Sequence, residues 1–324
     1  MIHRILNLFK RLLKKIAYYL LLSPVLKNTN WYKNLFVEDI YPGNIWYREH
    51  EERNFDLVTL GSSGAKWAFD FSSCSIKAMN WAQQPQTLVE DYNLLRNFHS
   101  ILRKGGFVII TIMPFTSLNK QTGIRDALKY QKVHAHEPIQ PYLYDKASRI
   151  AHIPMLIGKP AIKALIKYLM GRDEPLKSDA VGMVTSNPMS NEQLEENAQA
   201  FVKGWKKQFG ILDFDAPLTS DNIKGRAFRI DLMRTLIDFC LERDYKPIFV
   251  IPPVTKHLSK YYTTKFEKLY IYDFLNEVDR DIPLLDYSHE ESFQCDDYYF
   301  NSFFMNLQGR RVFTKRILSD IDNL

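Results

Sequence analysis

Short apolar runs recur along this chain of 324 residues, and amphipathic segments separate most of them. The most constraining run is 107–113, Phe-Val-Ile-Ile-Thr-Ile-Met, which ends at Pro114 and is typical of a strand buried on both faces of a sheet. Four shorter runs predict further strands, at 55–60, 75–82, 246–251 and 282–287. Amphipathic helices are predicted at 87–102, 226–244, 265–278 and 309–321. Strands that alternate with helices predict a parallel sheet covered by helices on both faces, so the expected fold class is α/β with about five parallel strands.

A sharp turn follows the first predicted strand. The apolar run that ends at Leu60 stops at Gly61-Ser62-Ser63-Gly64, and a helix can start just beyond it. In parallel α/β sheets, a turn of small residues at the carboxyl end of a buried strand presents a side chain at the edge where these proteins place their chemistry. Ser63, or its neighbour Ser62, is therefore a candidate nucleophile, and a tight strand-to-helix turn without chemistry is the alternative.

Residues 118–225 interrupt the alternation of strands and helices. They contain helical patterns at 159–170 and 191–209 and no strong core strand. Such an insert usually covers or shapes the site at the edge of the sheet. We expect 159–170 to pack on the protein as an ordinary amphipathic helix, with a second membrane contact as the less favoured alternative. The predicted parts are an N-terminal helix, the first half of the α/β domain, a helical insert and the second half of the domain, at 1–30, 31–117, 118–225 and 226–324.

The N-terminal segment has the most unusual composition in the chain. Residues 1–15 carry five Lys or Arg side chains and no acid, and apolar residues recur at helical spacing through 1–22. A basic amphipathic helix of this kind is typical of a segment that lies in an anionic membrane surface. The apolar run 16–26 contains Pro24 and is too short to span a bilayer. We predict a cytoplasmic protein held peripherally at the inner face of the membrane. The alternatives are a helix docked on the protein's own core, and an exported or membrane-anchored protein.

Charge and cysteine usage argue against several classes of protein. The net charge is +6, and beyond the N-terminus basic residues are scattered among acids, so no nucleic-acid footprint is predicted. The three cysteines, Cys74, Cys240 and Cys295, are too widely spaced for a metal knuckle or a disulfide framework, and they fit a reducing compartment. His134 and His136 form a His-x-His pair, but spacing fixes no third ligand, so we predict neither a metal nor another cofactor.

Four short blocks occur in an order that resembles a known superfamily. They are Leu60-Gly61-Ser62-Ser63, Asn80-Trp81-Ala82, Val250-Ile251-Pro252-Pro253-Val254 and Asn306-Leu307-Gln308-Gly309. The order is similar to that of the SGNH/GDSL hydrolase superfamily, in particular the branch associated with bacterial surface-polysaccharide genes, and it covers residues 55–115 and 228–318. The resemblance implies a flavodoxin-like three-layer α/β/α sandwich that hydrolyses esters or transfers acyl groups, commonly acetyl groups on sugars. A carbohydrate or acyl-sugar substrate is the partner that it implies.

The resemblance also implies roles for individual residues. It places the nucleophile at Ser63, in a turn that points backbone N–H groups at a developing oxyanion. Ala82 stands where the family has a glycine whose N–H is a further oxyanion donor, and the family's Gly-x-Asn-Asp block is replaced by Met-Pro-Phe-Thr at 113–116. The oxyanion and substrate-binding residues implied in this way are Gly61, Ser62, Gly64, Asn80, Ala82, Asn301 and Asn306.

The largest departure from the family lies near the C-terminus. Relatives carry Asp-x-x-His before a Leu-Asn-x-x-Gly block. Alignment on Asn306 and Gly309 puts Asn301 where the Asp belongs and Phe304 where the His belongs. Phenylalanine cannot accept a proton, and asparagine cannot stabilise an imidazolium as a carboxylate does. The Ser-His-Asp arrangement is therefore broken, and residues 300–305 are predicted to form a packed aromatic strip.

Other histidines could supply the missing base. His289 follows the last predicted strand, three residues after Asp286, and His257 follows the fourth. His289 is the candidate catalytic base, and the alternative for both residues is a histidine in a surface loop. Four loop acids could bind a cation or a sugar, although a solvated loop is the favoured interpretation; they are Glu290, Glu291, Asp296 and Asp297.

Two functions follow from these residues. The first is an SGNH-like esterase or O-acyltransferase that acts on a cell-surface polysaccharide or its precursor through Ser63. The second is a catalytically degenerate protein of the same fold that binds a glycan or a polysaccharide-biosynthesis partner at the membrane. The order of the blocks favours the first, whereas Asn301 and Phe304 favour the second. The esterase or O-acyltransferase is the function that we predict, and the degenerate protein is the alternative. A purely structural scaffold at the membrane is a third hypothesis, but it leaves the Gly-Ser-Ser turn unexplained.

Overall fold

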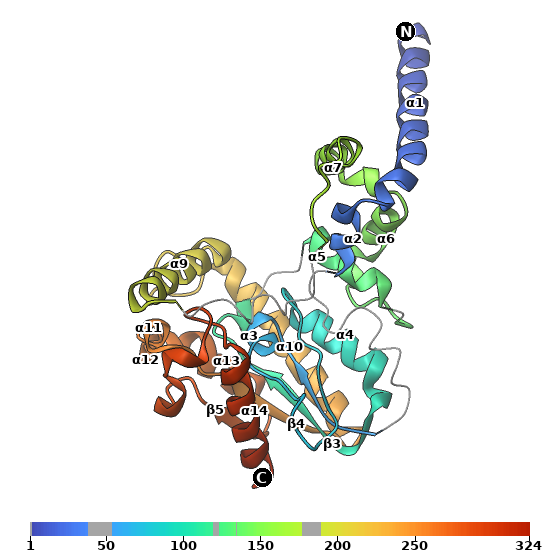
Figure 1. Ribbon diagram of the computed structural model, residues 1–324. Helices are drawn as coiled ribbons and strands as arrows, with labels where there is room; N and C mark the ends of the chain where they lie inside the picture. The colour runs from blue at the N-terminus through green and yellow to red at the C-terminus, as the bar shows by residue number, and fades with distance from the viewer. Residues whose placement is uncertain (1, 38–53, 119–122, 134, 177–188) are drawn as a thin grey trace. The chain divides into compact units, whose positions relative to one another are not determined.

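The computed structural model describes residues 2–37, 54–118, 123–133, 135–176 and 189–324. The chain forms two compact units, each built from two stretches that are separated in the sequence (Figure 1). The smaller unit consists of 1–49 and 123–180, and the larger unit consists of 50–122 and 181–324.

The larger unit contains one sheet of five parallel strands. They are β1 (Phe55–Leu60), β2 (Ala78–Asn80), β3 (Leu102–Thr111), β4 (Lys246–Ile251) and β5 (Leu284–Asp286). Their spatial order is β2-β1-β3-β4-β5, which is the order of flavodoxin-like doubly wound folds. The predicted α/β fold class, with three layers and a helical insert, is confirmed.

Helices connect the strands of this unit and cover the sheet. They are α3 (Ser63–Lys66), α4 (Leu88–Phe98), α9 (Asn191–Phe209), α10 (Ser220–Leu241), α11 (Lys256–Ser259), α12 (Thr264–Glu267), α13 (Asp273–Val278) and α14 (Leu307–Ile321). The helix predicted at 87–102 ends earlier, at Phe98, because β3 already begins at Leu102. A shift in the pairing of β1 with β3 accommodates Gly105, whose φ of +70° suits glycine.

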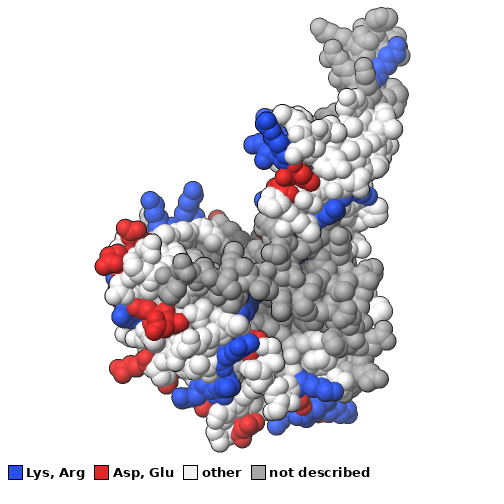
Figure 2. All heavy atoms as spheres, viewed as in Figure 1, with Lys and Arg blue, Asp and Glu red and all other residues white. Residues whose placement is uncertain are grey.

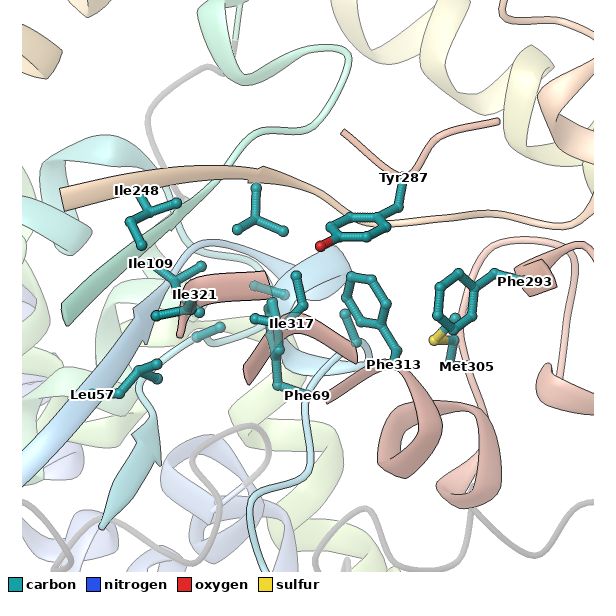
Figure 3. Close-up of a cluster of buried hydrophobic side chains, with 14 of the residues drawn as sticks. Leu57, Phe69, Ile109, Ile248, Tyr287, Phe293, Met305, Phe313, Ile317 and Ile321 are labelled. Atoms are coloured by element: carbon teal, nitrogen blue, oxygen red, sulfur yellow. The ribbon is translucent and has the colours of Figure 1, made fainter. Parts of the chain in front are cut away.

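One face of the sheet is covered by α14 (Figure 3). This helix contributes an apolar side chain every fourth residue, and the three central strands contribute side chains that point toward it. The strands contribute Leu57, Ile109 and Ile248, and α14 contributes Phe313, Ile317 and Ile321. Because these side chains are almost fully buried, each stabilises the fold by about 1.5–3 kcal/mol.

The second face of the sheet is covered by α4 and α10, which contact each other. Strand side chains alternate between the two faces, so Val58, Val108 and Phe249 lie on this side and are buried. α10 buries Met233 and Ile237 completely. The sheet is therefore apolar on both faces, as the run 107–113 predicts.

The smaller unit consists of helices. They are α1 (Ile2–Lys27), α2 (Asn30–Val37), α5 (Ile124–Leu128), α6 (Tyr144–His152) and α7 (Lys159–Leu169). One apolar cluster joins α2, α5 and α6, and it includes Leu35, Leu128 and Ile150. A second cluster joins the end of α1 to α7, and it includes Leu26 and Leu165.

The units divide the chain differently from the predicted ranges. Residues 123–180 of the predicted insert belong with the N-terminal helices, whereas α9 and α10 belong with the sheet. α2, expected in the α/β domain, packs in the smaller unit. Helical periodicity identifies an apolar face but does not say which other helix covers it, so these boundaries could not be read from the sequence.

The predicted N-terminal helix is present as α1 and continues through Pro24. Its last turns dock on α7 through Leu26, as the alternative of a docked helix requires. In contrast, Ile16, Leu20 and Leu21 are 47%, 53% and 73% exposed. Across the described part of the chain, no helix combines the length and the apolarity needed to cross a membrane.

Candidate active site

The first strand ends at a backbone turn that favours glycine. Gly61 has φ = +138°, and a Cβ added to it would lie 2.9 Å from Ala65 Cβ and 3.0 Å from Thr111 Cβ. Thr111 is the last residue of β3, so the turn is pressed against the neighbouring strand. In this sheet the strand order reverses between β1 and β3. Doubly wound folds bind their ligands at such a point, beyond the carboxyl ends of the two strands. The predicted Gly-Ser-Ser turn therefore lies where this fold class places its ligands.

A buried carboxyl group holds the turn in place. Asp91 Oδ1 accepts hydrogen bonds from the Gly61 N–H at 2.8 Å and from Gln86 Nε2 at 2.6 Å. Burial raises the pKa of Asp91 to about 7, against the lowering effect of these two hydrogen bonds. Repulsion from Glu90 raises this pKa further, whereas attraction to Arg229 lowers it. Asp91 thus fixes the glycine that precedes both serines.

Ser62 and Ser63 follow this glycine, and both are partly exposed. Ser63 is the first residue of α3. The Ser62 hydroxyl does not cap this helix; it accepts the Gln86 N–H at 3.3 Å. Gly64 lies against Met113, whose Cε would be 2.7 Å from a Cβ at this position. Because the first N–H groups of a helix have no acceptor within it, the turn carries backbone donors beside Ser63.

Asn80 ties the end of β2 to the helix that begins at Ser63. Its Nδ2 donates to the Ala65 carbonyl at 3.1 Å. Its Oδ1 accepts the Thr59 hydroxyl at 2.8 Å and the Ala82 N–H at 3.0 Å. The Ala82 N–H, which the resemblance implies as an oxyanion donor, is thus bound to the Asn80 side chain. A role in binding an oxyanion would require Asn80 to release it.

The C-terminal loop reaches α3 with aromatic side chains. Trp67 directly follows this helix and donates its Nε1–H to Gln84 Oε1 at 2.9 Å. The Phe300 ring lies 5.1 Å from the Trp67 ring in an edge-on arrangement, and the Phe304 ring lies 6.3 Å from it. Phe304 is 8% exposed. Phe304, which the alignment with the resembled superfamily puts at the position of its base, therefore lies close to the helix of Ser63 as a buried phenyl ring. The predicted aromatic strip is confirmed.

The two asparagines of this loop bind within their own segment. Asn301 Oδ1 accepts the N–H groups of Phe303 at 2.9 Å and Phe304 at 2.7 Å, which closes a tight turn. Asn306 is the N-cap of α14, where its Oδ1 accepts the Gly309 N–H at 3.0 Å. Both side-chain oxygens thus shape the loop and the start of the helix.

His289 follows β5 and pairs with Glu267 rather than Asp286. Its Nε2 lies 2.6 Å from Glu267 Oε1, and its side chain is 50% exposed. Burial raises the pKa of Glu267, although the hydrogen bond to His289 lowers it. Such a pair can act as an acid–base unit. However, β3 and β4 lie between β1 and β5, so the ends of β1 and β5 are three strand spacings of about 4.8 Å apart, or about 14 Å. The side chains of Ser63 and His289 are too short to meet across this distance.

His257 follows β4 and lies between two carboxylates. Its Nδ1 is 3.4 Å from Glu195 Oε2, and its Nε2 is 3.2 Å from Asp296 Oδ2. Both ring nitrogens therefore face carboxylate oxygens of Glu195 and Asp296. His257 instead links α9 to the loop that precedes α14.

Two of the four predicted loop acids contact basic side chains of the protein. Asp296 lies 3.4 Å from Lys256 Nζ in addition to its contact with His257, and Glu290 lies 3.5 Å from Arg316 Nη1. The remaining two, Glu291 and Asp297, are exposed. Contacts of this kind are typical of a solvated loop.

The predicted His-x-His pair falls in the smaller unit, and His134 lies outside the described residues. His136 and Glu137 line a cavity of about 200 Å³ together with Tyr130 and Tyr144. Among the residues that the structure describes, no group of three or more His, Cys, Asp or Glu could hold a metal ion.

Two residues that define the turn, Asp91 and Gln86, are not among the predicted site residues. The sequence carries one signal for Asp91: it lies three residues after Leu88 and four before Leu95, on the apolar side of the predicted helix. An acid in such a position requires partners in the core. One of those partners is the Gly61 N–H, and it lies next to Asp91 only in the folded chain.

No protein-family model and no curated protein matches this chain.

Proposed function

We propose that this chain is an SGNH-like protein of surface-polysaccharide metabolism that binds a glycan or an acyl-sugar at the carboxyl edge of its sheet, without the Ser-His-Asp chemistry of that superfamily. The observation that carries this proposal is the burial of Phe304 against Trp67, next to the helix that begins at Ser63. A phenyl ring in that place leaves the serine without the base that would activate it.

The groups that remain at this edge suit binding. Ser62 and Ser63 are partly exposed and carry hydroxyl groups that can both donate and accept hydrogen bonds. Hydroxyl and backbone N–H donors fit the hydroxyl and carbonyl oxygens of an acylated sugar.

A second candidate is an esterase or O-acyltransferase that uses Ser63 as its nucleophile. It is favoured by the exposure of Ser63 at the first turn of α3, and by the Glu267–His289 pair at the same edge of the sheet. In that case the serine oxygen would attack the acyl carbonyl of an ester, and its proton would pass to an imidazole. The C–O bond of the ester would then break, the alcohol would leave with the proton from the imidazole, and the acyl-serine would pass its acyl group to water or to a sugar hydroxyl. His289 would have to move toward Ser63 for this step.

A serine-reactive fluorophosphonate separates the two candidates. We expect wild-type protein and the Ser63→Ala variant to be labelled equally weakly, because Ser63 lacks an activating base. Ser62→Ala is the matched control. If the wild type and Ser62→Ala are labelled and Ser63→Ala is not, the result would contradict the binding proposal. It would support the esterase or O-acyltransferase. Binding is measured by titration calorimetry with O-acetylated and deacetylated oligosaccharides, and Ser63→Leu should weaken it at least tenfold.

Restoring the missing groups tests the alignment on which the resemblance depends. The double variant Asn301→Asp with Phe304→His should gain fluorophosphonate labelling that depends on Ser63, because the loop already lies beside α3. The control pairs Asn301→Asp with Phe303→His, which places the imidazole one residue away. Labelling of neither variant, with both folded, would contradict the assignment of Phe304 to the position of the base.

We also propose that residues 1–22 hold the protein at the inner face of a membrane. The exposure of Ile16, Leu20 and Leu21 on α1 and the absence of acids from 1–37 support this contact. Deletion of 1–22 should release the protein from vesicles that contain anionic phospholipid, as measured by co-sedimentation. Unchanged binding after the deletion would contradict the proposal.

A further inference from the structure

α7 has a buried side and an exposed apolar ridge. Its buried side, with Ala161 and Leu165, packs against α1 and accounts for the ordinary amphipathic packing predicted for this helix. The ridge is formed by four large apolar side chains within nine residues. They are Ile162, Ile166, Leu169 and Met170, which are 44%, 52%, 69% and 58% exposed. Single exposed apolar residues are common, but a contiguous group of them marks a contact surface.

A row of lysines runs beside this ridge. Lys159, Lys163 and Lys167 are spaced by four residues and exposed, so they lie along one line of the helix surface. The chain has no acid between Asp145 and Asp173. Figure 2 shows basic side chains in blue on the unit that contains α7. An apolar ridge beside a basic row suits an interface where acyl chains meet anionic headgroups, because lysine stems extend from the first region into the second.

The same unit carries a second surface of this kind. α1 and α7 contact each other, and α1 exposes Ile16, Leu20 and Leu21. Residues 1–37 contain no acid. In the larger unit, by comparison, Leu212 and Leu241 are each followed directly by an acid, whereas Ile223 and Phe228 are followed by a basic residue. Within the smaller unit, α1 and α7 each combine exposed apolar side chains with a long stretch of sequence that contains basic residues and no acid.

We infer that α7 is a membrane-binding helix in its own right, and that with α1 it forms a two-helix surface for a bilayer containing anionic phospholipid. The inference extends the contact proposed for residues 1–22 to a segment more than a hundred residues further along the chain. A second copy of the chain fits the ridge less well. In a symmetric dimer through α7, two rows of three lysines would face each other without acids between them.

Co-sedimentation of the full chain with vesicles tests the inference. The vesicles consist of phosphatidylcholine alone, or with about one third phosphatidylglycerol. The combined variant Ile162→Ser, Ile166→Ser and Leu169→Ser should bind the anionic vesicles at least tenfold more weakly. Its control, Leu212→Ser, Ile223→Ser and Leu241→Ser, removes as many exposed apolar side chains from the larger unit and should bind as the wild type does.

The charge component is tested in the same assay. The combined variant Lys159→Gln, Lys163→Gln and Lys167→Gln should lower the partition coefficient about fivefold for each lysine at low salt. Its control, Lys203→Gln, Lys207→Gln and Lys224→Gln, removes exposed lysines of the larger unit and should have little effect. Circular dichroism and thermal melting verify that each variant is folded.

Several outcomes would overturn the inference. Equal vesicle binding by the wild type and both α7 variants would exclude α7 from the membrane contact. A change from dimer to monomer in the ridge variant, seen by light scattering and without a change in vesicle binding, would assign the ridge to a second copy. If deletion of 1–22 abolishes binding while the α7 variants bind normally, only this inference fails. If the α7 variants lose binding and the deletion does not, the contact proposed for 1–22 fails instead.

Discussion

Replacement of Asp91 by asparagine removes a titrating carboxyl group from the Gly61 turn while it preserves the hydrogen bonds made there. An asparagine Oδ1 can accept the same Gly61 N–H and Gln86 Nε2–H that the aspartate Oδ1 accepts. The remaining difference is the ability to ionise inside the core. The variant therefore isolates the energetic consequence of burying this carboxyl group.

The expected magnitude follows from the pKa of Asp91 in the two states. The group titrates near 3.8 in the unfolded chain and near 7 in the folded protein, where burial opposes its ionisation. Below pH 3.8 both states are protonated, and Asp91 does not destabilise the fold. As pH rises toward 7, the unfolded chain loses its proton first and stability falls by about 1.4 kcal/mol for each pH unit. Above pH 7 the loss is complete, at roughly 4 kcal/mol.

Urea denaturation followed by circular dichroism, from pH 4 to pH 8, measures this effect. Relative to the wild type, Asp91→Asn should become more stable as pH rises, with a difference at pH 8 that exceeds the difference at pH 4 by up to about 4 kcal/mol. Asp281→Asn removes an exposed carboxyl group and is the control. A difference between the wild type and Asp91→Asn that stays constant across this range would refute the reasoning.

Two paired substitutions test the packing that positions the site. Phe313→Ala should lower the free energy of unfolding by about 3–5 kcal/mol because it empties a fully buried position. Its control is Val312→Ala, at a side chain that is 38% exposed, which should lower this free energy by less than about 1 kcal/mol. Equal decreases of the two free energies in urea denaturation would contradict the burial of Phe313. Gly309→Ala should destabilise the protein by about 1–3 kcal/mol, because the new Cβ would lie 2.8 Å from Tyr298 Cβ. At Gly204 no atom lies within 4 Å of the new Cβ, so Gly204→Ala should stabilise the protein by about 0.5–1 kcal/mol through helix propensity and raise its thermal midpoint. A change of the thermal midpoint in the same direction for both glycine substitutions would contradict this reasoning.

The sequence predicts those features that depend on neighbouring residues. The run 107–113 identifies a strand buried on both faces, and Gly61 is predictable because a tight turn at the end of a strand favours glycine. The aromatic strip at 300–305 is predictable because its residues cannot carry charge. The first follows from the run of apolar residues, the second from the conformational range of glycine, and the third from side-chain polarity.

Features that depend on distant partners were not predictable in this way. His289 pairs with Glu267 of α12 rather than with the nearby Asp286, because the fold brings α12 alongside the loop after β5. Asp91 is assigned to the turn only once β1 and α4 are placed together. Likewise, the amphipathic pattern of 159–170 identifies two faces but does not say that only one of them is covered.

The order of synthesis has a consequence for the sheet. β3 and β4 are paired neighbours, yet β3 ends at Thr111 and β4 begins at Lys246. At about 5–20 residues per second, a ribosome needs roughly 7–27 s to deliver the second strand after the first. During this time the apolar edge of β3 has no strand to pair with, whereas the smaller unit is already complete at residue 180. We therefore expect the nascent chain to fold its helical unit first and to depend on chaperone protection of β3 until β4 emerges.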